Sequence, residues 1–388
     1  MRPIERTLLP LLLVTMGALA AIAPLPGAAE QLRFVWFADS RSATPTVSNP
    51  PLIDLMNAPV LTAIRDEILA LSPRPQFAVF GGDMAYRGKY KGDWTFPTWN
   101  NLVLQPLKDA GINVYVTVGN HELYQHPGAG FYLENQVKFQ QTYLDNPANG
   151  PAGYERLAYS FTSPGGEIFF AALDPYYLDG DQPNVDEEDN GKIDTPQLAW
   201  FESQAQQSTA KHKFLFIHTP YYSVTSTSPA DGSYTRLWQI LDDNRFDAYF
   251  CGHAHLFSRK TIDGRVPPNP NFLPPITWNH DIVQLLNGAA GAGPDSGATI
   301  IRDASWHVSN APQTYYFSVV DIDGPAMRIA SYRGNTGRYE LFDVYPDPAA
   351  QVPTLSEWAM AACALLLLAS AGVALRRRAA ARSGPPGR

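Results

Sequence analysis

Six residues of the types that bind transition metals each follow a short apolar run. Asp39 stands in "FADS", Asp83 in "GGDMAY" and Asn120 in "VGNHE", while three histidines come from "FIHTP" and "CGHAH". Two carboxylates, one amide and three imidazoles suit borderline ions such as iron, zinc or manganese, whereas calcium prefers oxygen ligands throughout. Glycines precede several of these residues, where a chain turns sharply or comes close to an ion. The pattern predicts a metal centre formed by Asp39, Asp83, Asn120, His218, His253 and His255.

The elements that must position these residues are predicted strands, with helices between several of them. Strand-like runs cover residues 32–38, 77–80, 112–118, 168–173, 213–217 and 247–251. Helical segments are predicted over residues 59–71, 96–110, 196–207 and 234–244. This alternation is typical of β-α units around a largely parallel sheet, whose strand ends gather functional residues at one edge.

The pattern changes after residue 255, where the helical periodicity fades. Strands are predicted over residues 256–262, 282–286, 315–322 and 327–332, joined by turns rich in glycine, proline and asparagine. An α/β first half and a strand-rich second half indicate two sheets packed face to face, with helices outside.

In this order and context, the five motifs resemble those of the calcineurin-like metallophosphoesterase superfamily, over roughly residues 32–333. The resemblance implies a four-layer α/β/β/α sandwich and a centre of two metal ions bridged by Asp83. It implies that Asn120, His218 and His253 complete one ion's ligands, and that Asp39 and His255 bind the other. The implied reaction is phosphoester hydrolysis by a metal-bound hydroxide. His121 would stabilise the transition state or protonate the leaving oxygen, the alternative being a structural hydrogen bond.

The segment "FADSRS" departs from the common first motif, Asp-x-His, in which both residues bind metal. Arg41 stands in the third position and is a permanent cation that cannot bind a metal ion. The purple acid phosphatase branch, which the chain resembles most closely, also lacks this histidine and uses a tyrosine three residues after the bridging aspartate. Tyr86 has that position in "GDMAY". The resemblance implies a Tyr86 phenolate on iron, paired with zinc, manganese or a second iron; the alternative is a loop aromatic away from the metal.

Two further residues are candidates for substrate binding. Arg41 has a planar fork suited to a phosphate oxygen, although a surface salt bridge is an alternative. Tyr222, which follows His218 in "HTPYYS" beside Tyr221, is a candidate pocket wall or an ordinary packing residue. The predicted substrate is a small phosphomonoester. A phosphodiesterase or nucleotide hydrolase on the same centre, or a surface binding protein with a degenerate metal site, are the alternatives.

Both ends of the chain are predicted to be targeting segments that flank a domain over residues 30–345. Residues 1–29 have the basic start, apolar stretch and small-residue end of a secretory signal, the alternative being an uncleaved anchor. Residues 346–388 contain a linker, an apolar helix over about 358–375 and an arginine cluster typical of a membrane anchor. "VPTLSEW" resembles the IPTL-type C-terminal sorting tails of exported Gram-negative proteins. This implies a protein of the periplasm or cell surface, held at the membrane until a sorting protease removes the tail.

Charge and cysteine content limit the remaining function classes. Outside the signal segment and the C-terminal helix and tail, the chain has 22 basic and 35 acidic residues, a net charge of −13, so no nucleic-acid scaffold is expected. Cys251 is the only cysteine outside the tail, which excludes an intrachain disulfide in the domain.

The acidic segment 186–197, "DEEDNGKIDTPQ", is predicted to be a solvated loop. A calcium site there is the alternative, with Glu188 and Gln197 as poor matches to the loop pattern.

Overall fold

The computed structural model describes residues 30–126, 133–176, 178–179, 182–183, 191–225, 232–263, 278–301 and 305–347. The predicted secretory signal and the predicted membrane helix lie outside these residues, as do residues 186–190 of the acidic segment 186–197. Within the described ranges, none of the helices is long and apolar enough to cross a membrane.

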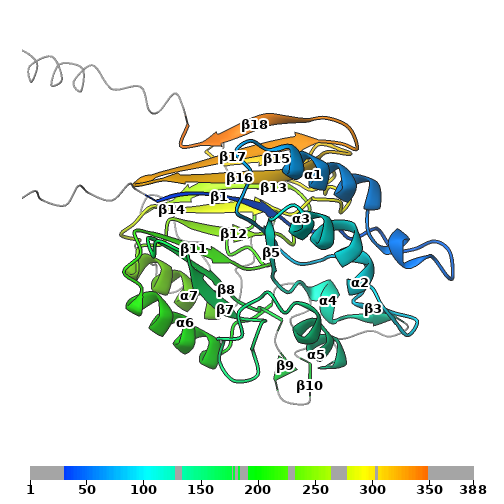
Figure 1. Ribbon diagram of the computed structural model, residues 1–388, viewed down its shortest axis with the longest axis horizontal. Coiled ribbons are helices and arrows are strands. Elements are labelled where there is room, and N and C mark those ends of the chain that lie inside the picture. Colours follow the sequence, from blue (N-terminus) through cyan, green and yellow to red (C-terminus); the bar gives the residue numbers. More distant parts are fainter. Residues whose placement is uncertain are drawn as a thin grey trace, which may run out of the picture.

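Two mixed sheets form the centre of the fold (Figure 1). The six-stranded sheet has the order β18 (Tyr339–Tyr345), β17 (Ala326–Gly334), β16 (Tyr315–Asp323), β1 (Gln31–Phe37), β2 (Phe77–Phe80) and β5 (Asn113–Val116). The seven-stranded sheet has the order β15 (His307–Ser309), β13 (Phe257–Ile262), β14 (Ile282–Asn287), β12 (Ala248–Cys251), β11 (His212–Phe216), β8 (Ile168–Ala172) and β7 (Tyr159–Thr162).

The sheets pack face to face because alternate residues of their strands are apolar on both faces. In β1, Phe34 and Trp36 point into the core between the sheets, whereas Val35 and Phe37 belong to the core under the helices. Trp36 stacks on Phe216 of the opposite sheet, with ring centroids 5.5 Å apart. This inner core fixes the distance between the two sheets, and therefore between the residues at their strand ends.

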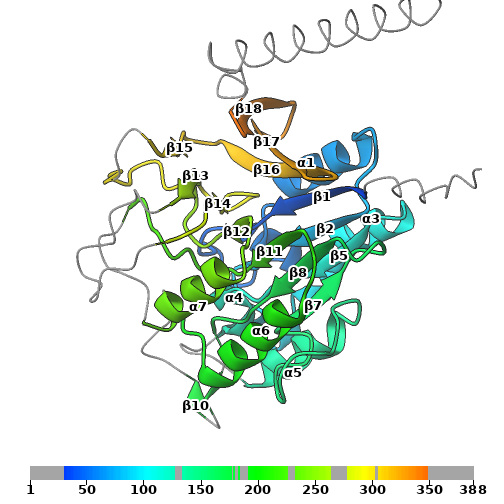
Figure 2. The same cartoon turned by 90° about the vertical axis from the view of Figure 1, so that its left-hand side faces the viewer.

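Helices cover the outer faces. Figures 1 and 2 show α6 and α7 on one side of the sheets and α1 and α3 on the other. The expected four-layer α/β/β/α sandwich is thus confirmed. The helical elements are η1 (Leu52–Leu55), α1 (Ala58–Ala70), α2 (Phe96–Trp99), η2 (Asn100–Leu104), α3 (Gln105–Asp109), α4 (Asn120–Leu123), α5 (Leu133–Thr142), α6 (Thr195–Gln207) and α7 (Gly232–Asp243).

Two small sheets complete the fold. One joins β4 (Asp93–Trp94), β3 (Lys89–Tyr90) and β6 (Gln125–His126), and the other joins β10 (Gln182–Pro183) and β9 (Leu178–Asp179).

The strands predicted between helices pair in parallel, as expected, and β16, β17 and β18 extend the first sheet in antiparallel fashion. Two details differ from the sequence-based expectations. The helix expected over 96–110 contains a π-helical turn, η2, ahead of Pro106. Proline has no N–H to donate, and the Leu102 carbonyl accepts from Arg65 instead, at 2.8 Å. The helix expected from Pro196 begins at Thr195, with Asp194 as the capping residue that accepts from the Gln197 N–H.

Candidate metal centre

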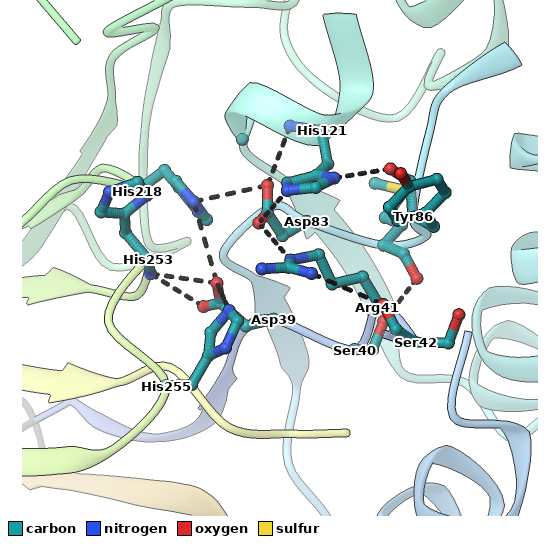
Figure 3. Close-up of polar contacts among 12 residues, drawn as sticks. Asp39, Ser40, Arg41, Ser42, Asp83, Tyr86, His121, His218, His253 and His255 are labelled. Carbon is teal, nitrogen blue, oxygen red and sulfur yellow. Dashed lines mark hydrogen bonds and ion pairs between the residues drawn. The ribbon is translucent and has the colours of Figure 1, made fainter. Parts of the chain in front are cut away.

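The predicted ligands meet where strands of both sheets end. Strands β1, β2 and β5 run parallel, and so do β11 and β12, so their carboxyl ends lie at one edge of the sandwich. The loops after these strands carry all six residues predicted as ligands from the strand-end motifs. Figure 3 shows five of them with side chains converging, namely Asp39, Asp83, His218, His253 and His255; Asn120 begins α4, directly after β5.

The backbone at this edge adopts a conformation that few residues tolerate. Asp39, Asp83 and His253 have φ of 61°, 59° and 71°, in the left-handed region. Non-glycine residues in this region cost free energy and cluster at functional sites. Neighbouring glycines allow the close approach: a Cβ on Gly119 would lie 2.3 Å from Asp83 Oδ1, and one on Gly252 would lie 2.3 Å from Asp39 Oδ2. The fold therefore holds the two carboxylates in place through the main chain.

One group of possible ligands comprises Asp39, Asp83 and His255, here called the first position. All three are buried, and each offers a ligand atom within 4.8 Å of the others. The Asp39 carboxylate accepts from the His253 main-chain N–H at 3.1 and 2.9 Å, and Asp83 Oδ1 accepts from the His121 N–H at 3.0 Å. His255 Nε2 lies 3.8 Å from Asp39 Oδ1.

A second group comprises Asp83, Asn120, His218 and His253, here called the second position. The Gly81 carbonyl accepts from His218 Nδ1 at 2.7 Å, which turns Nε2 toward Asp83 Oδ1 at 3.5 Å. His218 Nε2 and Asn120 Oδ1 are both buried, and neither has a hydrogen-bond partner among the described residues. Buried polar atoms are normally paired, so two buried atoms with unused lone pairs, one of them 3.5 Å from a carboxylate, fit a metal ion.

The electrostatics of the centre also suit a cation. Burial lowers the pKa of His253 to about 3, and burial followed by the charge of Arg41 lowers the pKa of His255 to about 4. These imidazoles are neutral at neutral pH, the form that binds metal. Burial and the charge of Asp83 raise the pKa of Asp39. Burial alone would also raise the pKa of Asp83, but its neighbours His121, His218 and Arg41 lower it. A bound ion would compensate the buried charge.

Arg41 points into the centre rather than out to solvent. Its Nε lies 3.4 Å from Asp83 Oδ2, and Figure 3 shows its guanidinium beside Asp83. The Arg41 main-chain N–H donates to the Asp83 carbonyl at 3.0 Å, which fixes the residue next to this carboxylate. The ion pair of Arg41 is with a buried predicted ligand and not with a surface residue, and phosphate binding by Arg41 stays a prediction.

Tyr86 is not brought to the first position by its side chain. Its main-chain carbonyl accepts from His121 Nδ1 at 2.6 Å, and its ring packs against the guanidinium of Arg87 at 4.8 Å. Figure 3 shows Tyr86 on the opposite side of Arg41 from Asp39 and His255. No hydrogen bond of its hydroxyl is present among the residues that the structure describes. Binding of a metal by Tyr86 stays a prediction from the resemblance.

His121 lies beside the carboxylate that both positions share. Because its Nδ1 donates to the Tyr86 carbonyl, Nε2 is the free ring atom, 3.8 Å from Asp83 Oδ2. Burial lowers the pKa of His121 to about 4. The imidazole is therefore placed to interact with a group bound at the ions rather than to bind an ion through Nδ1.

Tyr222 packs within an aromatic cluster. Its ring contacts Tyr221 and Trp238, its hydroxyl accepts from Trp278 Nε1 at 3.0 Å, and it is 3% exposed. These contacts agree with the packing alternative weighed from the sequence, and substrate binding by Tyr222 stays a prediction.

Two residues of the site had no role assigned from the sequence. The buried Glu122 carboxylate accepts from the main-chain N–H groups of Asp83, Met84 and Gly119, each at 2.7 Å. Burial and the charge of Asp83 raise the pKa of Glu122 to about 8. The sequence pattern that could have indicated this role is the glutamate at the end of "VGNHE". It stands three residues after Gly119, the spacing of a helix capping box.

Tyr176 is the other residue without a role from the sequence. Its hydroxyl lies 3.3 Å from His253 Nδ1 and 2.9 Å from Thr219 Oγ1. It follows β8, as the ligands follow their strands, but a tyrosine in "LDPYY" has no metal-binding signature of its own. The hydroxyl orients an imidazole of the second position.

Comparison with known proteins agrees with this arrangement. Residues 54–257 match the calcineurin-like phosphoesterase family. No curated protein shows significant sequence similarity to the chain.

Several solved structures share the fold at low sequence identity. GAP50, described as the anchor in the inner membrane complex of Plasmodium, is 15% identical with a TM-score of 0.52, over 81% of this chain and 88% of GAP50. The purple acid phosphatase PPD1 of yellow lupin (Lupinus luteus) is 15% identical with a TM-score of 0.54, over 83% of this chain and 54% of the lupin protein. PhoD is 13% identical with a TM-score of 0.53, over 82% of this chain and 73% of PhoD. The chain thus spans about half the length of the lupin enzyme.

Proposed function

Because the chain belongs to the calcineurin-like phosphoesterase family, we propose that it is an exported, metal-dependent hydrolase of small phosphomonoesters. One observation carries the proposal. His218 Nε2 and Asn120 Oδ1 are buried without a hydrogen-bond partner among the described residues, and His218 Nε2 lies 3.5 Å from Asp83, a carboxylate that also belongs to the group of Asp39 and His255. A buried polar atom without a partner lowers the stability of the folded protein, and a bound cation would supply the missing partner for both atoms.

The residues fit a centre of two ions, with Asp83 shared between the first and second positions. Ions of this kind polarise a phosphoryl oxygen and lower the pKa of water. Iron with zinc, manganese or a second iron is the combination that the resemblance implies. The protein's own part is to fix the ligands: the main chain of His253 holds Asp39, the Gly81 carbonyl orients His218, and Glu122 anchors the Asp83 loop.

His121 is proposed to act on the substrate. Its Nδ1 proton is committed to the Tyr86 carbonyl, so Nε2 faces the space beside Asp83. From there it can share a proton with the phosphoryl or leaving oxygen. The low pKa set by burial means that the imidazole carries this second proton only where the negative charge of a bound phosphate stabilises it.

The proposed substrate class rests on the resemblance of the motifs. Arg41 is proposed to contact a phosphate oxygen when the substrate displaces it from Asp83, and Tyr222 to line the site. A phosphodiester or a nucleotide remains the alternative substrate, since the ligands define the ions rather than the leaving group.

Export and membrane attachment complete the proposal. They depend on the signal-like residues 1–29 and on the apolar segment and arginine cluster near the C-terminus. We expect the full chain to fractionate with membranes and a chain ending at Pro353 to be released into the periplasm or medium. Full-length protein recovered wholly in the soluble fraction with its tail intact would contradict the anchor.

The decisive test is a panel of monoesters, diesters and nucleotides assayed after removal of metal and reconstitution with iron, zinc or manganese. We expect activity that depends on added metal and is highest with monoesters. Metal binding without hydrolysis of any ester would support the surface binding protein instead. Preferential hydrolysis of diesters would keep the enzyme class and change the substrate.

A further inference from the structure

We propose that Arg41 makes the first position the weaker of the two ion sites, so that the protein keeps one ion tightly at the second position and exchanges the other. This inference rests on the proposed metal centre.

The first step is the number of ligands. The second position has four side chains, Asp83, Asn120, His218 and His253, whereas the first has three, Asp39, Asp83 and His255. Arg41 occupies the place in the sequence where a histidine would supply a fourth ligand to the first position. A guanidinium has five N–H donors and no lone pair for a metal, so it cannot replace that ligand.

The second step is the location of the charge. Arg41 Nε is buried, lies 3.4 Å from Asp83 Oδ2 and makes no hydrogen bond among the described residues. A cation at the first position would use the same carboxylate and would lie within a few ångströms of the guanidinium. Like charges at that separation repel strongly where water is excluded. His218 of the second position lies 3.5 Å from the other oxygen of this carboxylate, Oδ1, so Arg41 competes with the ion of the first position for Oδ2.

The third step is that the main chain of Arg41 is fixed. Its N–H and that of Ser40 both donate to the Asp83 carbonyl, at 3.0 and 2.9 Å. The Ser40 hydroxyl donates to the Met84 carbonyl at 2.8 Å and accepts from Trp99 Nε1. The main chain of Arg41 is thus fixed to the Asp83 loop, and only rotation of its own side chain can increase the distance from the first position.

Tyr86 does not compensate for the missing ligand in this arrangement. Its ring lies against Arg87 and 6.0 Å from the His121 ring. A phenolate at the first position would require the side chain to leave both contacts. The structure consequently favours an exchangeable divalent ion over a tightly held ferric ion at this position.

The test uses the full-length protein, freed of metal with a chelator and titrated with Mn²⁺ or Zn²⁺ by calorimetry. Metal content is measured by mass spectrometry after desalting. For the wild type we expect two binding steps with Kd values at least about tenfold apart, and about one ion per chain after desalting. Two steps of equal affinity, or two ions retained by the wild type, would overturn the inference without any variant.

Four variants separate charge from ligand number. Arg41→Gln removes the charge and should tighten the weak step by about tenfold, and Arg41→His adds a ligand and should retain two ions. Arg41→Lys keeps the charge and should behave as the wild type. Arg87→Gln is the matched control, since Arg87 is also a cation near His121 but is paired with aromatic rings rather than with Asp83. An Arg41→Gln protein that titrates like Arg87→Gln would contradict the role of Arg41.

The outcome is independent of the proposed function. A two-step titration in a protein that hydrolyses none of the esters would contradict the hydrolase and leave this inference standing. An active enzyme with two ion sites of equal affinity would support the hydrolase and contradict this inference.

Discussion

The first and second ion positions share Asp83 but differ in how their side chains are held. At the second position, His218 is oriented by the Gly81 carbonyl and His253 lies beside the Tyr176 hydroxyl, so each imidazole has a neutral partner behind it. At the first position, His255 has the charged Asp295 carboxylate behind it, 3.9 Å from its Nδ1, and Arg41 Nε lies 3.4 Å from Oδ2 of the shared Asp83. One position is supported by neutral hydrogen-bonding groups and the other is surrounded by formal charges.

A set of ligands therefore does not by itself fix the affinity of a site for an ion. Both positions have buried carboxylate and imidazole groups that a motif search finds equally well. A permanent cation next to one of them changes the charge that an incoming ion experiences, because burial weakens the screening by water. The family resemblance describes the second position fully and the first only in part.

The largest expected effect is that of Asp83→Ala. Asp83 is the only carboxylate shared by both positions, and it also receives the His121 N–H and the Arg41 ion pair. We expect kcat/KM to fall by about 10³-fold or more, because charge stabilisation by the ions is worth several kcal/mol. Metal content should fall below one ion per chain. An Asp83→Ala protein with near-normal turnover and two bound ions would show that Asp83 is not a ligand shared by the two positions.

The sequence predicted that the six candidate ligands would follow strand ends at one edge of the sandwich, because strand polarity and glycine positions are local properties of the chain. Strands β2 and β14 lie within one residue of their predicted ranges for the same reason. The positions of Arg41 and Tyr86 could not be predicted, because long side chains on loops choose between rotamers through contacts with distant residues. β18 and α5 were missed for another reason: their periodicity is weak, and packing rather than local pattern stabilises them.

The next largest effect should distinguish the two positions directly. His218→Ala removes a ligand of the second position, and His255→Ala removes one of the first. If the positions are unequal, His218→Ala should lose the ion that survives desalting, whereas His255→Ala should keep it and lose only the exchangeable one. Metal content of the two variants, measured side by side after desalting, gives the answer. The reverse pattern would place the tight site on the Asp39 and His255 side.

His121→Ala should affect turnover and leave both positions filled. His121 is proposed to act on the phosphoryl or leaving oxygen and to bind no ion, so kcat should fall by about 10²-fold while metal content stays unchanged. His121→Asn, which keeps a hydrogen-bonding side chain, should recover part of the lost rate. Loss of an ion from His121→Ala would instead show that His121 is a ligand at one of the two positions.

Tyr86→Phe should have the smallest effect and tests the sequence-based hypothesis most sharply. The contact between Tyr86 and the centre is made by its main-chain carbonyl, which accepts from His121 Nδ1, and phenylalanine keeps that carbonyl and the ring that packs on Arg87. We therefore expect kcat/KM and metal content within about twofold of the wild type, and a protein without a strong visible absorption band. The phenolate hypothesis makes the opposite statement. If the hydroxyl turns inward to bind a ferric ion, the oxidised wild type would be coloured, and Tyr86→Phe would lose both the colour and the ion of the first position. A visible band that disappears in Tyr86→Phe would show that the first position gains an anionic ligand after all, and that the two positions are more alike than their side chains in this structure suggest.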